Sequence, residues 1–115
     1  MNREIKFRAW DKEYNRIIDS ETIDDFVFRQ SKNNYILMQY TGLKDKNRVD
    51  IYEGDILKIH KGYKPYGKGP WSVVWNNRKL CFQLDTYKNN KIGAKNVEVI
   101  GNIYENPELI NPQND

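Results

Sequence analysis

The sequence has one cysteine, Cys81, and one histidine, His60, among its 115 residues. A single cysteine excludes an internal disulfide and any metal site built from several thiolates, which suits a reducing compartment. Nucleophilic catalysis needs a base beside the nucleophile, and these two residues form no recognisable catalytic motif. We therefore expect a surface or strand-end histidine, an inert thiol and a protein that is not an enzyme.

Long apolar runs are also lacking. No segment approaches the roughly 20 apolar residues of a membrane span, and residues 2–10 contain no signal-peptide core. We therefore expect no membrane partner and a location in the cytoplasm of the cell that makes the protein.

Apolar residues make up only 38% of the chain and the mean hydropathy is −0.90, yet aromatic residues reach 13%. Disordered chains are poor in aromatics, so this composition favours a folded protein with a small aromatic core. The length predicts a single domain, residues 1–110, followed by a frayed tail, residues 111–115. The net charge of +3 permits an anionic partner without requiring one.

The N-terminal part predicts a β-hairpin. Ile5, Phe7 and Ala9 alternate with charged residues and Trp10, and the chain can return antiparallel over residues 16–19. An outward Trp10 would also suit a contact in a homo-oligomer. Residues 21–26 predict at most a short, weakly capped helix, and residues 26–28 predict a further strand.

The stretch from residue 40 to residue 60 organises the rest of the chain. A strand over residues 35–40 leads into a turn at residues 45–47, where Asn47 can accept a positive φ. Gly54 is expected where the chain must swing into the next strand, starting near Ile56.

Four short strands joined by polar turns follow from Leu57 onward, with a tight turn at Asn76-Asn77 and a kink or bulge at Gly101. The pattern is typical of a mainly β fold, a small curved sheet or an SH3-like barrel with an N-terminal β-hairpin and little helix. The predicted core consists of apolar side chains that recur in phase: Ile5, Phe7, Leu57, Ile59, Val73, Trp75, Leu80, Phe82, Val97 and Val99.

Four sequence blocks resemble one known family. They are REIKFRAWD at residues 3–11, YTGLKDKN at residues 40–47, IYEGDI at residues 51–56 and VEVIGNIYENPEL at residues 97–109. In this order they are similar to the YopX family of small phage and prophage proteins. The resemblance implies phage origin and a β-rich fold, and it brings no activity or functional residues with it.

Two clusters could carry chemistry. The first holds four acids, Asp45, Asp50, Glu53 and Asp55, but Val49 occupies a position where a calcium loop requires an Asp or Asn. Turn-forming acids balanced by neighbouring bases explain this cluster more simply, so we expect no metal and no cofactor.

The second cluster is a basic loop over residues 58–71 with interleaved aromatic rings and no acid. Lysines that neutralise phosphates and rings that stack on bases are how sequence-tolerant single-strand binders work. A solvated hairpin loop is the alternative explanation. The candidate nucleic-acid or anion-binding residues are the basic and aromatic members of this loop together with Arg8 from the first strand: Lys58, Lys61, Tyr63, Lys64, Tyr66, Lys68 and Trp71.

Two functions therefore remain open. One is a phage-encoded accessory binding protein that contacts a host protein or defence factor without catalysis. The other is a small β-barrel that binds nucleic acid or a nucleotide through the loop of residues 58–71.

Overall fold

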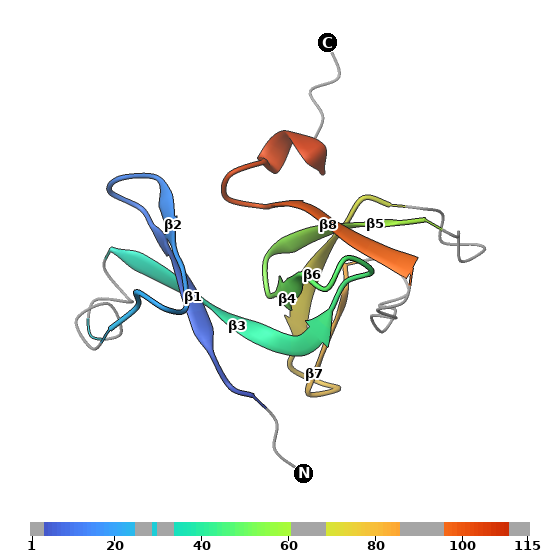
Figure 1. Ribbon diagram of the computed structural model, residues 1–115, viewed down its shortest axis with the longest axis horizontal. Helices are drawn as coiled ribbons and strands as arrows, with labels where there is room; N and C mark the ends of the chain where they lie inside the picture. The colour runs from blue at the N-terminus through green and yellow to red at the C-terminus, as the bar shows by residue number, and fades with distance from the viewer. Residues whose placement is uncertain (1–3, 25–28, 30–33, 61–68, 86–95, 111–115) are drawn as a thin grey trace.

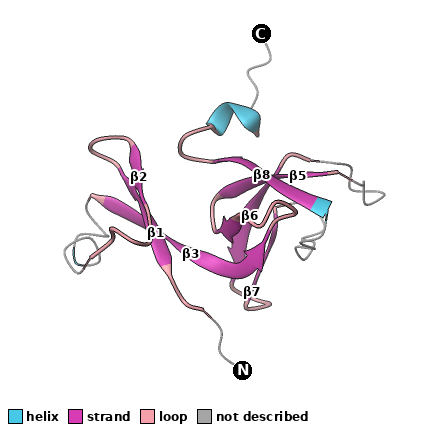
Figure 2. Ribbon diagram, in the orientation of Figure 1, coloured by secondary structure: helices cyan, strands magenta, loops and turns pink. Residues whose placement is uncertain are grey.

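The computed structural model describes residues 4–24, 29, 34–60, 69–85 and 96–110. Its described part is built mainly from strands, magenta in Figure 2, with only short helical segments in cyan. The strands are β1 (Phe7–Asp11), β2 (Arg16–Ile18), β3 (Tyr35–Lys44), β4 (Asp50–Tyr52), β5 (Asp55–Ile59), β6 (Trp71–Asn76), β7 (Cys81–Leu84) and β8 (Val97–Asn102), and the helix is η2 (Pro107–Leu109).

The strands form two antiparallel four-stranded sheets (Figure 1). The first has the order β2-β1-β3-β4 and the second the order β7-β6-β5-β8. Because β4 ends the first sheet and β5 lies inside the second, the short connection between them joins the two sheets. The prediction of a mainly β fold with an N-terminal hairpin and little helix is confirmed.

The first hairpin has the predicted antiparallel pairing, with Asp11 opposite Arg16. The buried Asp11 carboxylate accepts hydrogen bonds from the amides of Glu13 and Tyr14 and so fixes the turn. Asn15 completes the turn at φ 54°, a conformation that asparagine tolerates better than most residues.

The strand predicted to end at Tyr40 continues to Lys44 as β3. Its first half pairs with β1 and its second half with β4, and the register shifts between Tyr40 and Lys44. In the following turn Arg48, not Asn47, has positive φ, at 66°. The turn is confirmed, but the positive φ that Asn47 could accept is adopted one residue later. The Asp45 carboxylate accepts the Asn47 and Val49 amides, and Arg48 lies between them.

The core lies mainly in the second sheet and is closed by Ile51 from β4. Four predicted members are confirmed as buried in it: Leu57, Ile59, Val73 and Val97. Phe82 and Val99 are partly buried and pack against this core. The prediction is wrong for three further residues, which are exposed and do not belong to the core: Ile5 at 63%, Trp75 at 41% and Leu80 at 71%.

The turn predicted at Asn76-Asn77 is longer than expected. Asn76 pairs with Cys81 at the ends of β6 and β7, so residues 77–80 form the loop. Leu80 has φ 54° in this loop, and the Asn76 side chain caps it by accepting the amides of Arg78 and Lys79. A left-handed loop residue cannot continue the strand pattern into the core, which explains the exposure of Leu80.

A bulge near Gly101 is confirmed. Ile56 pairs with Gly101 and Leu57 with Val99, so Ile100 is the extra residue of β8. A Cβ atom on Gly101 would lie 2.5 Å from Asn106 Oδ1, and glycine therefore permits this close approach.

A short helix was predicted over residues 21–26, of which residues 21–24 are described and are not helical. They belong to a turn in which the Asp19 carboxylate accepts the amides of Glu21 and Thr22. Residues 25–28, including the strand predicted there, and the tail 111–115 lie outside the described residues. Within the described part, no helix is long and apolar enough to cross a membrane.

Candidate functional site

The connection between β4 and β5 ties the two sheets together at Gly54. The Gly54 amide donates to the Val73 carbonyl of β6, and its carbonyl accepts the amide of Ile103. Next to it, the Glu53 amide donates to the Gln39 carbonyl of β3. Gly54 has φ 88°, and a Cβ atom there would lie 3.1 Å from Met38 Sδ. The expectation that Gly54 has a special conformation is therefore confirmed.

A buried ion pair lies beside this connection. Arg8 Nη2 is 2.7 Å from Asp55 Oδ1, and the other carboxylate oxygen accepts the Tyr52 amide. The Arg8 guanidinium also lies 4.6 Å from the centre of the Tyr52 ring. Burial raises the pKa of the Asp55 carboxyl, and the Arg8 charge and the Tyr52 amide offset part of that rise. Arg8 is thus part of the link between the sheets.

The other acids of the predicted cluster also have structural partners. Asp45 accepts the Val99 amide of β8 in addition to the two amides of its own turn. Burial alone would raise the pKa of the Asp45 carboxyl, but these amide bonds lower it below its usual value. Asp50 forms ion pairs with Lys6 and Lys44. No group of three or more potential ligands that could hold a metal occurs among the described residues.

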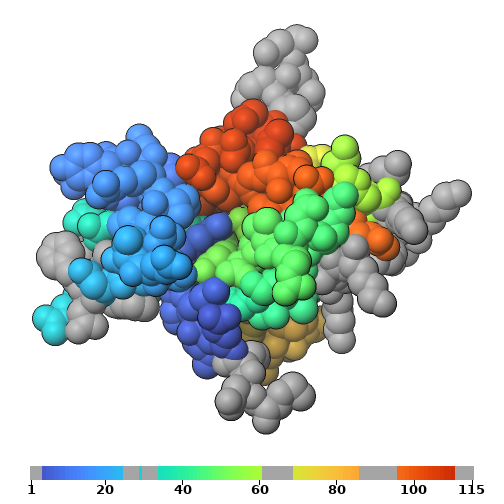
Figure 3. All heavy atoms as spheres, viewed as in Figure 1, coloured from blue at the N-terminus to red at the C-terminus, as the bar shows by residue number. Residues whose placement is uncertain are grey.

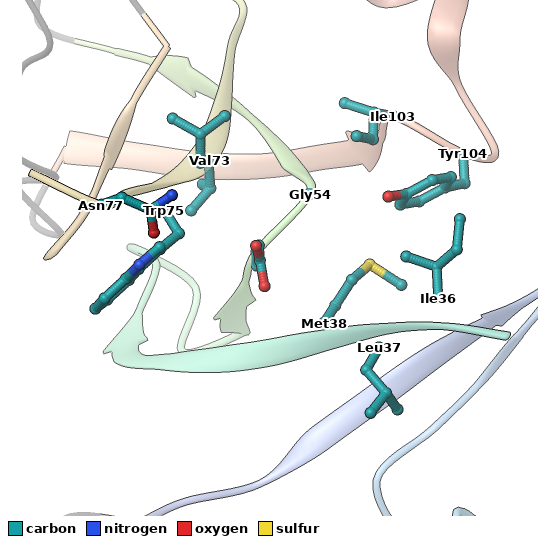
Figure 4. A pocket seen from close by; sticks show the side chains of 11 residues that line it. Ile36, Leu37, Met38, Gly54, Val73, Trp75, Asn77, Ile103 and Tyr104 are labelled. Atoms are coloured by element: carbon teal, nitrogen blue, oxygen red, sulfur yellow. The ribbon is translucent and has the colours of Figure 1, made fainter. Parts of the chain in front are cut away.

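A groove of about 390 Å³ opens above the junction (Figure 4). It is bounded by β3, by the β4–β5 connection, by β6 and by the segment that follows β8. Trp75 and Asn77 lie at one end, Tyr104 and Ile36 at the other, and Met38 between them (Figure 4). Among the described residues that line the groove, Glu53 is the one with a charged side chain.

The two aromatic residues of the groove are held in place by neighbouring rings. The Trp75 ring meets Phe82 edge-on at a centroid distance of 4.9 Å. Tyr104 stacks on Trp10 at 5.7 Å, which brings the C-terminal segment against the N-terminal hairpin. Figure 3 shows this C-terminal segment, in orange and red, between the blue hairpin and the green strands. Burial raises the pKa of the Tyr104 hydroxyl, and the Glu53 charge adds to the rise.

The predicted basic loop lies mostly outside the described residues. Lys61, Tyr63, Lys64, Tyr66 and Lys68 all belong to the stretch that is not described. Their role in binding nucleic acid or another anion stays a prediction.

The described ends of that loop have partners in the fold. Lys58 is exposed, but its cross-strand partner is Glu98, whose carboxylate lies 2.6 Å from His60 Nε2. Trp71 packs against the core of the second sheet. The acid beside Lys58 weakens the attraction of this lysine for a phosphate. The packing of the Trp71 ring leaves less of its surface for stacking on a base.

Arg8 and Trp10 both have partners within the described part of the chain. The Arg8 side chain is only 13% exposed and pairs with Asp55, and Trp10 stacks on Tyr104 within the same chain. The Arg8 charge is therefore already paired within the fold, and its part in anion binding stays a prediction.

The groove was missed at the sequence level because its residues come from four separate segments. Trp75 was assigned to the core on its alternation with Val73, and Glu53 was treated as a turn residue. The sequence signal that could have pointed to the groove was the block IYEGDI, in which the acid Glu53 precedes Gly54, the glycine that joins two strands.

The fold defines a class of small two-sheet β proteins, and a solved structure has the same architecture. The crystal structure of protein EF1440 from Enterococcus faecalis aligns with a TM-score of 0.70 and 26% sequence identity, covering 95% of this chain and 99% of that chain. No curated protein matches the chain. The sequence profile described as YopX protein matches residues 22–111, so the chain belongs to the YopX family. Membership suggests a small phage-type protein.

Proposed function

We propose that this phage-type protein acts by binding a protein partner, a host or defence factor, without catalysis of its own. The observation that carries the proposal is Trp75, which is 41% exposed and held against Phe82 at the mouth of the groove. Large aromatic side chains that are exposed and fixed are enriched at protein interfaces. A rigid ring also loses little side-chain entropy when a partner covers it.

The positions of His60 and Cys81 support binding over catalysis. Leu57 pairs with Trp71 at the start of β6, so His60, three residues further along, lies beyond that end. Cys81 pairs with Asn76 at the other end of β6. At about 3.3 Å per residue the two ends of β6 are about 16 Å apart, too far for proton transfer between the two side chains.

The test is affinity capture from a lysate of the host, with identification and then purification of the captured protein. We expect one partner that binds the purified wild-type chain in a fixed stoichiometry. The Trp75→Ala variant should weaken this binding at least tenfold, because alanine removes the exposed anchor.

Tyr14→Ala is the matched control, since Tyr14 is an aromatic residue that is 67% exposed on the β1–β2 turn. It should leave binding unchanged. Equal binding by wild-type and Trp75→Ala protein, or turnover of a substrate by the purified chain, would contradict the proposal.

A further inference from the structure

Along residues 35–39, the side of β3 that faces away from β1 has no strand neighbour among the described residues, whereas β4 occupies this side from Tyr40 onward. Gln39 uses its main chain on this side to bind Glu53. Main-chain groups alternate in direction along a strand, so Leu37, two residues earlier, directs its N–H and C=O to the same side. The Leu37 side chain points away from the groove in Figure 4, and Leu37 therefore lines the groove through its main chain.

Open strand edges of this kind accept an extended peptide as an additional strand. Its main chain would bind Leu37, and its side chains would alternate between the groove and the outside. Trp75 and Tyr104 offer apolar contacts on the groove side.

The charge of the groove selects among possible peptides. Glu53 supplies the single charge among the described lining residues, and its carboxylate meets the Gln39 amide only at a long 3.4 Å. A lysine or arginine on the incoming strand would form a charge-assisted hydrogen bond with it. An acidic peptide would be repelled.

We infer that the groove binds a short extended segment of the partner protein, with a basic residue at Glu53 flanked by apolar residues. This inference rests on the proposed function, and it names the part of the partner that is recognised. The segment adds to the open edge of β3 beside Leu37.

The experiment is selection from a displayed library of random heptapeptides, followed by titration of the selected peptides, made synthetically, against the purified full chain. We expect peptides with a lysine or arginine between apolar residues. Glu53→Gln should weaken their binding about tenfold, as expected for the loss of one charge-assisted contact. N-methylation of alternate main-chain amides in the peptide should abolish binding, because it removes strand pairing.

Glu53→Gln keeps the side-chain oxygen that accepts the Gln39 amide, so the fold should be retained, and a thermal melt checks this. Glu108→Gln is the control, since Glu108 is exposed on η2 and does not line the groove. Selection of acidic or uncharged peptides would overturn the inference, as would a Trp75-dependent dimer in sedimentation, which would make the groove an interface between copies.

The two proposals can fail separately. If a host partner is captured through Trp75 but selected peptides bind equally to wild type and Glu53→Gln, the groove inference is wrong and the proposed function stands. If basic peptides bind the groove but no partner protein is captured, the proposed function is the one that fails.

Discussion

Gly54 is the glycine at the junction between the two sheets. It combines φ 88° with a Cβ position only 3.1 Å from the sulfur of Met38, a side chain that is 1% exposed. Alanine at this position would therefore add steric contact to backbone strain.

We predict that Gly54→Ala lowers the free energy of unfolding by more than about 1 kcal/mol, measured by urea denaturation. Gly42→Ala is the matched control, because Gly42 has φ 90° with no atom within 4 Å of the added Cβ. Gly42→Ala should lower the free energy of unfolding only by the backbone strain of the positive φ, about 1 kcal/mol. Equal costs for the two variants would show that Met38 adjusts freely.

A second prediction concerns the buried pair of Arg8 and Asp55. Arg8→Met leaves the Asp55 carboxylate buried without its cation, and breaking such a pair costs about 3–5 kcal/mol. The variant should lose less stability at low pH, where Asp55 is protonated, because burial already raises the pKa of this carboxyl.

The control is the double variant Arg8→Met with Asp55→Asn, which removes both charges and should recover part of the loss in urea denaturation. A pH-independent cost of Arg8→Met, or no cost at all, would contradict the structural role of Arg8.

At the scale of elements, the β3–β4 turn is hydrogen-bonded to β8. Asp45 accepts the Val99 amide, and the Lys46 amide donates to the Val97 carbonyl. Asparagine at position 45 would place an amide donor against another donor, so we predict that Asp45→Asn costs on the order of 1–3 kcal/mol at neutral pH.

The pH dependence of this cost has a defined sign. The pKa of Asp45 is lower in the folded state than the unfolded value of about 3.9, so its stabilisation is complete above about pH 4. It is lost as the pH falls through the folded-state pKa, and the difference between wild type and Asp45→Asn should shrink there in urea denaturation. The exposed Asp85→Asn is the control; a pH-independent difference would contradict the prediction.

The basic loop allows a separate test of nucleic-acid binding. If Lys61, Lys64 and Lys68 contact phosphates, affinity for a single-stranded oligonucleotide should fall with salt at a log-log slope of about −0.7 per contact. Each lysine-to-alanine change should flatten that slope, whereas Tyr66→Ala should cost about 1–3 kcal/mol at unchanged slope. Fluorescence anisotropy measures both, with Lys79→Ala as the control. No binding at low salt would remove this function.

Local patterns predicted the strands well, because alternation depends on neighbouring residues. They failed where strand pairing between distant parts of the chain decides whether a side chain is buried. Trp75 continues the alternation of Val73, but β5 pairs with β6 only at Trp71 and Ser72, so the far end of β6 has no neighbour on that side among the described strands. The groove could not be predicted for the same reason: the bonds from Gly54 to Val73 and Ile103 span distant parts of the chain.

At the scale of the whole molecule, the two sheets share the Gly54 junction and the turn held by Asp45. We therefore predict a single cooperative unfolding transition, in which far-UV circular dichroism and tryptophan fluorescence change together. The tryptophans report on both sheets, since Trp10 lies in the first and Trp71 and Trp75 in the second. Two separate transitions would show that the sheets are independent domains.

The position of β8 in the second sheet has a consequence for biosynthesis. β5 pairs with β8 from Asp55 to Ile59, and β8 contributes the fully buried Val97. Because β8 follows β5 by about 40 residues in chain order, a nascent chain displays Leu57 and Ile59 before the strand that pairs with them has been synthesised. Such exposed apolar surface is what chaperones bind and what drives aggregation. Folding of this sheet must therefore wait until β8 has left the ribosome.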